Sequence, residues 1–266
     1  MPAITRDSRT INFTDSGGSG TPVLLLHAFP LNSKQWDGQI ESLSERFRFI
    51  APDLQGFGGS DAPDDESAYS MDSYADDAAA ILDELGLDKV VLTGLSMGGY
   101  ISFAFLRRHR DRVSGLVLAD TKAEADPPEA KEKRTTQQAQ VRADGTAGLI
   151  EGLSGALLGE ATREKKPDVV EATKKLMAEN PPAGFIGALE AMKNRPDSSG
   201  ELGAIDVATL IIVGENDGVT PVAASEALNQ GIAGSKLVVI PESGHLSNLE
   251  APEAFNGALA EFLGSL

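Results

Sequence analysis

The chain contains no cysteine among its 266 residues. This absence excludes a disulfide framework, a thiolate metal site and a cysteine nucleophile. Histidine is also scarce, with three widely separated residues, so a metal site built from histidines is not expected. Proteins without disulfides are typical of reducing compartments, and we therefore expect a cytoplasmic protein.

Long apolar runs are missing as well. The longest runs, such as residues 23–26 and 210–213, are far shorter than the roughly 20 residues that cross a bilayer. The first residues show no apolar run after their basic residue, so the sequence predicts no signal peptide. Neither a membrane span nor a targeting segment is expected.

Basic residues are few compared with acidic ones, because 23 Lys and Arg stand against 40 Asp and Glu, for a formal net charge of -17. A surface of this sign is a poor partner for nucleic acid and for anionic membranes. The segment 61–88 carries ten acidic residues and no basic one. We interpret this run as a solvated helix face, and the alternative is that it steers cationic substrates.

Short runs rich in Val, Leu and Ile alternate with helical stretches. Continuous apolar strands are typical of a sheet covered on both faces, and their alternation with helices predicts an α/β protein with a mostly parallel, doubly wound sheet. The predicted strands span residues 10–13, 22–26, 48–51, 89–93, 115–119, 209–213 and 236–240. The predicted helices between them span residues 33–46, 71–85, 97–108, 221–231 and 252–263.

The interval between residues 119 and 209 breaks this alternation, because it contains no convincing strand. Four helices are predicted there, at residues 128–142, 146–158, 167–179 and 183–193. Since the sheet pattern resumes afterwards, we predict a helical cap at residues 121–204, inserted into an α/β core formed by residues 1–120 and 205–266. A separate helical domain is the alternative.

A serine stands at the sharpest predicted turn. The sequence Gly94-Leu95-Ser96-Met97-Gly98 joins an apolar strand to a helix. Such a turn exposes the serine hydroxyl and directs backbone N–H groups toward the place where an oxyanion forms. Serine is a poor nucleophile unless a neighbouring base takes its proton. Ser96 is therefore the candidate nucleophile, and the chain must supply a base.

The three histidines make the search for this base short. His109 lies in a basic segment at the end of the helix after Ser96, where a surface group at a helix C-terminus is expected. His27 and His245 both follow strands, at the sheet edge where reactive groups gather. Where a serine occupies such a turn, the acid and then the histidine follow it along the chain. Only His245 satisfies this order, so it is the candidate base.

The candidate acid is Asp217, which follows the strand at 209–213 and precedes His245 by about one helix and one strand. Its role would be to hold the imidazole tautomer and to stabilise the imidazolium ion. Asp120 ends the strand at 115–119 and is a rival acid from an equivalent position. Glu215 is a poorer candidate, because the two-residue alternation points its side chain elsewhere.

These motifs give the chain its resemblance to known proteins. It resembles the serine-nucleophile α/β-hydrolase superfamily, near the small esterases, enol-lactonases and cofactor-free haloperoxidase-like perhydrolases. The resemblance covers residues 20–120 and 205–265 and implies an α/β-hydrolase fold. Besides the Ser96 turn, it depends on His27-Ala28-Phe29-Pro30, on Trp36-Asp37, on the glycine-rich segment 51–60, on Gly214-Glu215-Asn216-Asp217 and on Ser243-Gly244-His245.

The resemblance also implies roles for further residues. It implies an oxyanion hole formed by the backbone N–H groups of Met97 and Phe29. His27 would support its loop, and Asp53 and Asp61 would form turns. Related dehalogenases and epoxide hydrolases carry aspartate at the nucleophile position, so a serine there favours acyl transfer through an acyl-enzyme, with no cofactor and no metal.

The predicted function is hydrolysis of small to medium carboxylic esters or lactones, with a small molecule as the expected partner. The alternatives are perhydrolysis at the same triad, which Pro30 favours, hydrolysis of a C–C bond, and a small-molecule receptor with slow hydrolysis.

The substrate pocket is predicted to be apolar. The candidates near the triad and in the cap are Phe29, Trp36, Met97, Leu246, Leu149, Leu153, Leu157, Phe185 and Leu189. Among the residues not assigned to the oxyanion hole or triad, we rank Trp36, Leu246, Phe185 and Leu189 as pocket candidates. Ordinary core packing is the alternative for these side chains.

Overall fold

One twisted sheet runs through the computed structural model, which describes residues 1–266. Its strands are β1 (Ala3–Arg6), β2 (Arg9–Asp15), β3 (Thr21–Leu26), β4 (Phe47–Pro52), β5 (Val90–Leu95), β6 (Val113–Ala119), β7 (Thr209–Gly214) and β8 (Lys236–Ile240). They lie in the order β1-β2-β4-β3-β5-β6-β7-β8. All pairs from β4 to β8 are parallel, whereas β1–β2 and β2–β4 are antiparallel. The mostly parallel sheet is confirmed.

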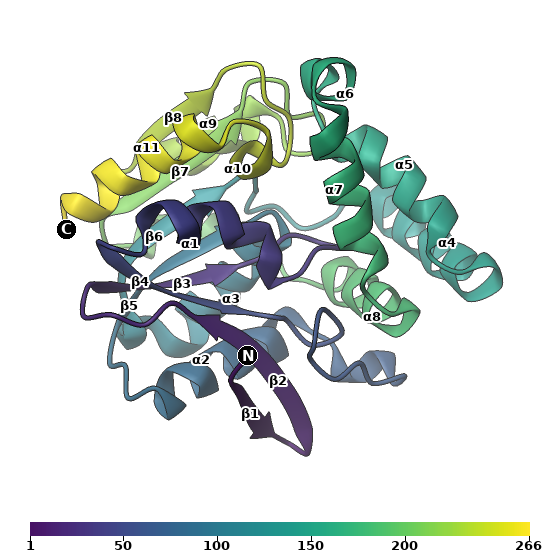
Figure 1. Ribbon diagram of the computed structural model, residues 1–266, viewed down its shortest axis with the longest axis horizontal. Helices are drawn as coiled ribbons and strands as arrows, with labels where there is room; N and C mark the ends of the chain where they lie inside the picture. Colours follow the sequence, from purple (N-terminus) through teal and green to yellow (C-terminus); the bar gives the residue numbers. More distant parts are fainter.

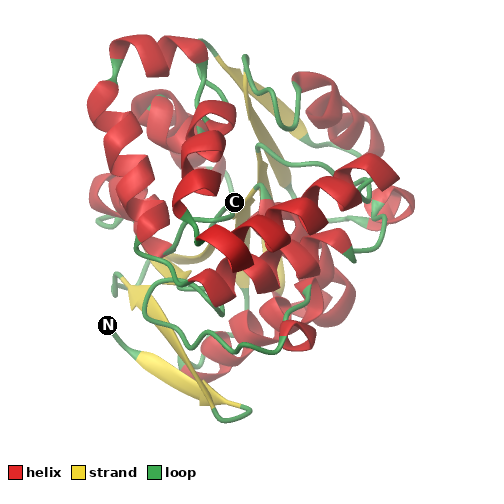
Figure 2. Ribbon diagram, turned by 90° about the vertical axis from the view of Figure 1, so that its right-hand side faces the viewer, coloured by secondary structure: helices red, strands yellow, loops and turns green.

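Helices cover both faces of this sheet, and Figure 2 shows the strands between two groups of helices. These helices are α1 (Asp37–Leu43), α2 (Met71–Glu84), α3 (Met97–His109), α9 (Val222–Gly231), α10 (Ser247–Glu250) and α11 (Pro252–Gly264). Helix α1 packs against α11, and α2 packs against α3. Short 3-10 turns span Ser33–Trp36, Glu66–Ala68, Arg110–Arg112 and Ser199–Ala204. None of the helices combines the length and the apolar character that a membrane crossing requires.

Five helices stand between β6 and β7 in the chain: α4 (Pro128–Asp144), α5 (Ala147–Leu157), α6 (Glu160–Lys165), α7 (Pro167–Ala178) and α8 (Pro182–Lys193). We call them the inserted helices. They gather on one side of the sheet, at the right in Figure 1. Phe185 and Leu189 of α8 belong to the same apolar core as the sheet residues, so this helix packs on the sheet domain.

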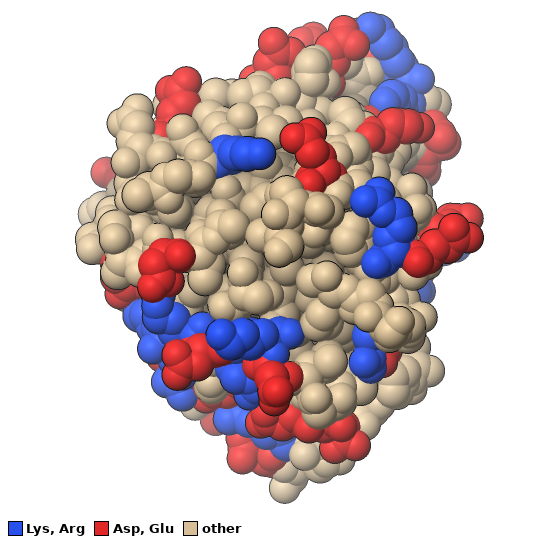
Figure 3. Space-filling model, turned by 90° about the vertical axis from the view of Figure 1, so that its left-hand side faces the viewer, with Lys and Arg blue, Asp and Glu red and all other residues tan.

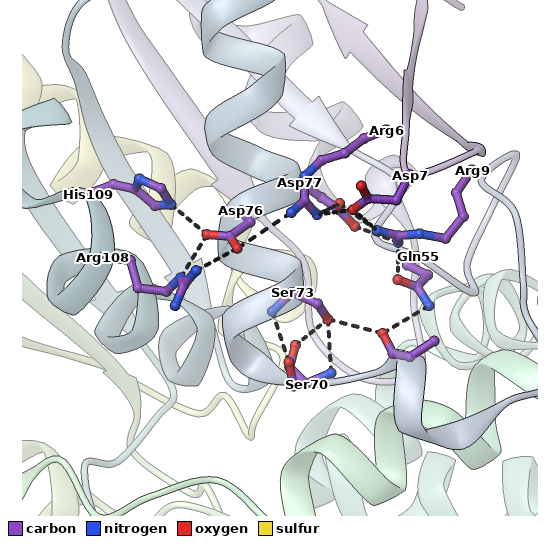
Figure 4. A network of polar contacts seen from close by, with 11 residues as sticks. Arg6, Asp7, Arg9, Gln55, Ser70, Ser73, Asp76, Asp77, Arg108 and His109 are labelled. Atoms are coloured by element: carbon purple, nitrogen blue, oxygen red, sulfur yellow. Dashed lines mark hydrogen bonds and ion pairs between the residues drawn. The ribbon is translucent and has the colours of Figure 1, made fainter.

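The acidic segment 61–88 is only partly solvated. Arg6 and Arg9 of the N-terminal hairpin pair with Asp77 of α2 at 2.7 and 3.0 Å, and Arg108 of α3 pairs with Asp76 at 2.7 Å (Figure 4). Figure 3 shows the face opposite the inserted helices, where acidic and basic side chains lie next to one another along the lower part. These ion pairs hold the N-terminal hairpin and the end of α3 against α2, so part of the acidic segment 61–88 has a structural role.

Candidate active site

Ser96 occupies the turn between β5 and α3 in an unusual conformation, with φ 55° and ψ -111°. Side chains other than glycine rarely adopt positive φ, and surrounding contacts must hold such a residue in place. The Ser96 N–H donates to the carbonyl of Ala119 at 2.9 Å, and the Ser96 carbonyl accepts from the Thr121 hydroxyl at 2.9 Å. Both contacts come from β6 and the residues after it, so the neighbouring strand fixes the turn.

The two glycines of the turn are required by close packing. A Cβ on Gly94 would lie 2.2 Å from the carbonyl oxygen of Gly98, and a Cβ on Gly98 would lie 2.1 Å from the carbonyl oxygen of Leu26. Helix α3 therefore approaches its own strand and β3 more closely than any side chain permits. Ser96 thus lies at the carboxyl end of β5, and the strand order reverses between β5 and its neighbour β3, where open α/β sheets hold their ligands.

The structure brings together the three residues predicted for acid–base and nucleophilic chemistry. His245, in the loop after β8, lies with Nε2 2.8 Å from Ser96 Oγ. Its Nδ1 lies 2.8 Å from Asp217 Oδ2, in the loop after β7. Donation from Nδ1 to the carboxylate leaves Nε2 free to accept the serine proton.

The Asp217 carboxylate accepts several further hydrogen bonds. Its Oδ1 accepts from the N–H groups of Val219 and Thr220 at 2.8 and 2.9 Å, and its Oδ2 accepts from the Thr220 hydroxyl at 2.7 Å. Burial alone raises the pKa of Asp217, but His245 and these hydrogen bonds outweigh burial and lower it. The carboxyl is therefore ionised beside the imidazole. Sequence reasoning missed Thr220, although a threonine three residues after an aspartate is a recognisable turn pattern.

The histidine is more basic than a free imidazole. Burial lowers the pKa of His245, but the charge of Asp217 and the hydrogen bond to it outweigh burial and raise the pKa above 6.5. A stronger base accepts the serine proton more readily, provided that it starts neutral.

The rival acid Asp120 is hydrogen-bonded to groups other than His245. Its Oδ1 accepts from the N–H of Gly214 at 2.8 Å, and its Oδ2 bonds to the hydroxyl of Ser247. Burial, and then the charge of Asp217, raise the pKa of Asp120 to about 8. The group is therefore a neutral acid at neutral pH, and it makes no hydrogen bond to His245.

Two backbone N–H groups beside Ser96 have no acceptor within the protein, those of Met97 and Phe29. Met97 is the first residue of α3, where helical N–H groups lack intrahelical partners and carry partial positive charge. The loop before Phe29 is fixed, because the Ala28 N–H donates to Gln35 Oε1 at 2.8 Å. Both N–H groups predicted for an oxyanion hole are thus free to donate to a ligand.

The other two histidines have structural contacts. His27 Nδ1 lies 2.9 Å from the Ala28 carbonyl, and its Nε2 accepts from the Leu54 N–H at 3.1 Å. Burial lowers the pKa of His27 to about 4, so the ring is neutral and joins two loops. His109 ends α3 with Nε2 2.8 Å from Asp76 Oδ1. Neither ring contacts Ser96.

The two aspartates expected to form turns also connect separate segments of the chain. Asp53 accepts from the N–H groups of Ser33 and Gly59 at 2.9 and 2.8 Å. Asp61 accepts from the N–H of Thr10 at 2.7 Å, which ties its turn to β2. No three His, Asp or Glu side chains lie where they could share a metal ion.

A family model described as the alpha/beta hydrolase fold matches residues 21–252. This chain belongs to the α/β-hydrolase family. The hydrolase is similar to a thermophilic esterase from Thermogutta terrifontis, with 41% identity and a TM-score of 0.95 over 99% of this chain and 98% of that chain. The predicted fold and resemblance are confirmed.

Two curated relatives carry the names of other activities of this family. One is 3-oxoadipate enol-lactonase 2 of Acinetobacter baylyi, 27% identical over 96% of this chain and 94% of the relative. The other is a non-heme haloperoxidase of Rhodococcus erythropolis, 30% identical over 100% of both chains.

A cavity of about 320 Å³ in this hydrolase reaches both Ser96 and His245. Its apolar part is formed by Phe29, Tyr100, Leu153, Leu157, Met192 and Val219. Of the cap residues proposed from the sequence, Leu153 and Leu157 therefore line the site.

The ranked pocket candidates lie elsewhere, which corrects that expectation. Trp36 is fully buried against Phe255, with ring centroids 6.1 Å apart. Phe185 packs edge-on against Phe29, and Leu189 and Leu246 are fully buried. None of the four contributes to the cavity wall. Large apolar side chains gain most from complete burial, so they fill the core beneath the site.

A buried carboxylate missed in the sequence secures the histidine loop. Glu250 accepts from the N–H groups of Gly244 and Leu246 at 3.0 and 3.2 Å, on both sides of His245, and from the N–H of Gly159 at 2.8 Å. Because Gly159 lies between α5 and α6, Glu250 ties the loop to the inserted helices. The signal available in the sequence was an acid shortly after His245 and just before a proline-initiated helix.

We expect Glu250→Gln to lower kcat about tenfold and to destabilise the hydrolase by about 1–3 kcal/mol, because its amide NH₂ would face backbone donors. Ester turnover and urea unfolding measure the two effects. The exposed Glu253→Gln is the control and should change neither. Unchanged kcat and stability in Glu250→Gln would show that the carboxylate does not hold the loop.

Proposed function

We propose that Ser96, His245 and Asp217 form the catalytic triad of a hydrolase that cleaves small to medium carboxylic esters or lactones. The observation that carries the proposal is the continuous hydrogen-bond chain from Ser96 Oγ through His245 to Asp217, which begins in a cavity. Three residues far apart in the sequence meet there with both distances at 2.8 Å.

In acylation, His245 Nε2 takes the proton of Ser96 as Oγ attacks the carbonyl carbon. The oxyanion that forms accepts hydrogen bonds from the N–H groups of Met97 and Phe29. Each donor of this kind is worth about 2.7–4 kcal/mol of transition-state stabilisation. The imidazolium ion, stabilised by Asp217, then gives its proton to the leaving alkoxide.

Deacylation repeats these steps with water. His245 takes a proton from the water molecule, the resulting hydroxide attacks the acyl-enzyme, and the same two N–H groups bind the second oxyanion. Protonation of Ser96 by His245 releases the carboxylic acid. A lactone follows the same path, except that its alcohol stays attached to the acyl group.

The size of the cavity supports small to medium substrates, since about 320 Å³ lies at the lower end of ordinary ligand sites. The names of the esterase and enol-lactonase relatives agree with this class. Perhydrolysis is the second candidate, which the haloperoxidase relative and Pro30 next to the oxyanion residue support. In that reaction hydrogen peroxide replaces water in attacking the acyl-enzyme.

A substrate panel tests the proposal. It contains p-nitrophenyl esters of increasing acyl length, a small lactone, and acetate with hydrogen peroxide, each assayed with the native protein. Turnover is expected for short esters or the lactone and should fall for long acyl chains, because the cavity is small. Absence of turnover across the panel contradicts the proposed function.

The rate should depend on pH through His245. Its pKa is raised above 6.5, and only neutral imidazole accepts the serine proton, so kcat/KM should rise with pH through an inflection above 6.5. Asp217→Asn should lower the pKa of the His245 ring itself, because Asp217 is the main cause of the raised pKa. Initial rates of the native protein from about pH 5 to about pH 9 at constant ionic strength measure the inflection, and an NMR titration of the imidazole measures the shift in the variant. A pH-independent rate would contradict a histidine base.

A further inference from the structure

The cavity that contains Ser96 has a positively charged side. Lys133 and Arg134 of α4 line it, together with Lys122 in the loop after β6. We call these three residues the cationic wall. Ala130 and Gln137 of α4 also line the cavity, and the spacing 130, 133, 134 and 137 belongs to one helix face. The charged lining thus combines one face of α4 with Lys122 from the loop after β6.

Two of these cations have no partner in the protein. Arg134 pairs with Asp126, which also pairs with Arg195 at 2.8 Å. The lysines that form ion pairs elsewhere are Lys34, Lys174 and Lys193. Lys122 and Lys133 line the cavity without an ion pair or hydrogen bond of their own, and Asp126 is the one carboxylate on its lining.

This positive charge stands out against the rest of the chain, whose formal net charge is -17. An acidic protein repels anions at a distance, so an anionic ligand would need a local attraction of this kind. The wall also argues against cationic substrates, the alternative that the acidic segment 61–88 suggested. The same cavity is also lined by the apolar side chains of Leu153, Leu157 and Val219. A ligand that matches both kinds of lining has an apolar stretch and an anionic end.

We propose that the cationic wall selects esters or lactones that carry a carboxylate away from the scissile carbonyl. This inference rests on the proposed function of Ser96. Charge-assisted hydrogen bonds from ammonium to carboxylate are stronger than neutral ones, and a partly enclosed cavity screens them less than bulk water does. Lys122 and Lys133 are then specificity-determining residues, and Arg134 is held in place by Asp126.

Two pairs of substrates separate the effect of a terminal carboxylate on the substrate from the effect of substrate length. Monoethyl glutarate and ethyl valerate differ in the end of the acyl chain, which is a carboxylate in one and a methyl group in the other. Likewise, 4-acetoxybutyrate and butyl acetate differ at the end of the alcohol chain. A pH-stat measures kcat/KM for all four. The variants are the double substitution Lys122→Gln/Lys133→Gln and the control Lys131→Gln, which removes one positive charge from an exposed position of α4 outside the cavity.

The native protein should prefer the anionic member of at least one pair by about tenfold, mainly through a lower KM. The double variant should lose most of this preference, Lys131→Gln should keep it, and added salt should weaken it. Cleavage without preference in either pair overturns the inference. So does a preference that the double variant retains, or one that Lys131→Gln loses equally.

Failure of the proposed function gives a different result, namely no cleavage of any of the four esters. Calorimetric titration of the Ser96→Ala protein with glutarate then tests the wall without chemistry. Binding that the double lysine substitution abolishes is expected. Absence of glutarate binding in that protein contradicts the inference.

Discussion

Replacing Ser96 by alanine is expected to lower kcat for p-nitrophenyl acetate by at least about 10⁴-fold. In the proposed mechanism the substitution removes the atom that attacks the carbonyl, while the proposed oxyanion donors, the N–H groups of Met97 and Phe29, are unchanged. The residual rate should therefore come from binding and from the oxyanion hole alone. Alanine fits the site, because its side chain is smaller than that of serine and the backbone contacts of Ser96 are retained.

Ser225→Ala is a matched control for this experiment. Ser225 is also buried, but its hydroxyl has no hydrogen-bond partner and it lies in α9, outside the cavity lining. It should keep turnover of the same order as the native protein. Thermal unfolding of both variants verifies that they fold. Near-native turnover in folded Ser96→Ala would remove Ser96 from the mechanism.

The second large effect is expected for Asp217→Asn, with a loss of about 10⁴-fold in kcat. An asparagine amide that donates to His245 Nδ1 would place the ring proton on Nε2, so that Nε2 could no longer accept the serine proton. It would also remove the charge that stabilises the imidazolium ion. The side chain keeps its shape, and its oxygen can still accept from the N–H groups of Val219 and Thr220.

Asp120→Asn is the companion experiment, because Asp120 was the rival acid. With a pKa of about 8, Asp120 is neutral at neutral pH, and an amide resembles a protonated carboxyl. The variant should keep kcat within about tenfold of the native value. Losses in the opposite order, large for Asp120→Asn and small for Asp217→Asn, would transfer the acid role to the end of β6.

The same substitution changes how stability depends on pH. The folded pKa of Asp120 lies above its ordinary value of 3.8, so its contribution to stability is complete below that value and is lost as pH rises toward about 8. Asparagine does not titrate, so Asp120→Asn should lose less stability between about pH 5 and about pH 8 than the native protein does. Urea unfolding at both pH values measures the difference, and an equal loss in both proteins would contradict it.

The sheet was largely predictable because its central strands are continuous apolar runs covered on both faces. β3, β5 and β7 consist mostly of Val, Leu and Ile, and nearly all of their residues are buried. β1 was missed, since its four residues mix polar and apolar side chains and it is the edge strand, paired only with β2. The predicted helix at 33–46 divides into a 3-10 turn, Ser33–Trp36, and the shorter α1.

The three residues of the hydrogen-bond chain were predictable because the order and direction of the strands fix where each one lies. Parallel strands end at one edge of the sheet, so Ser96, Asp217 and His245 converge once their strands are ordered. The cavity wall was not predictable in the same way. A search for apolar side chains selects Phe185 and Leu189, which belong to the core, and passes over Lys122 and Lys133. Which face of α4 meets the cavity depends on how the inserted helices pack, and the strongly polar sequence of α4 does not show it.

The most direct test of Ser96 as the nucleophile is covalent labelling with a fluorophosphonate, followed by intact mass and peptide mass spectrometry. We predict one adduct, on the peptide that contains Ser96, with esterase activity lost in proportion to labelling. The Ser96→Ala protein should remain unlabelled. An adduct on a different residue, or full esterase activity in completely labelled protein, would contradict a mechanism through Ser96.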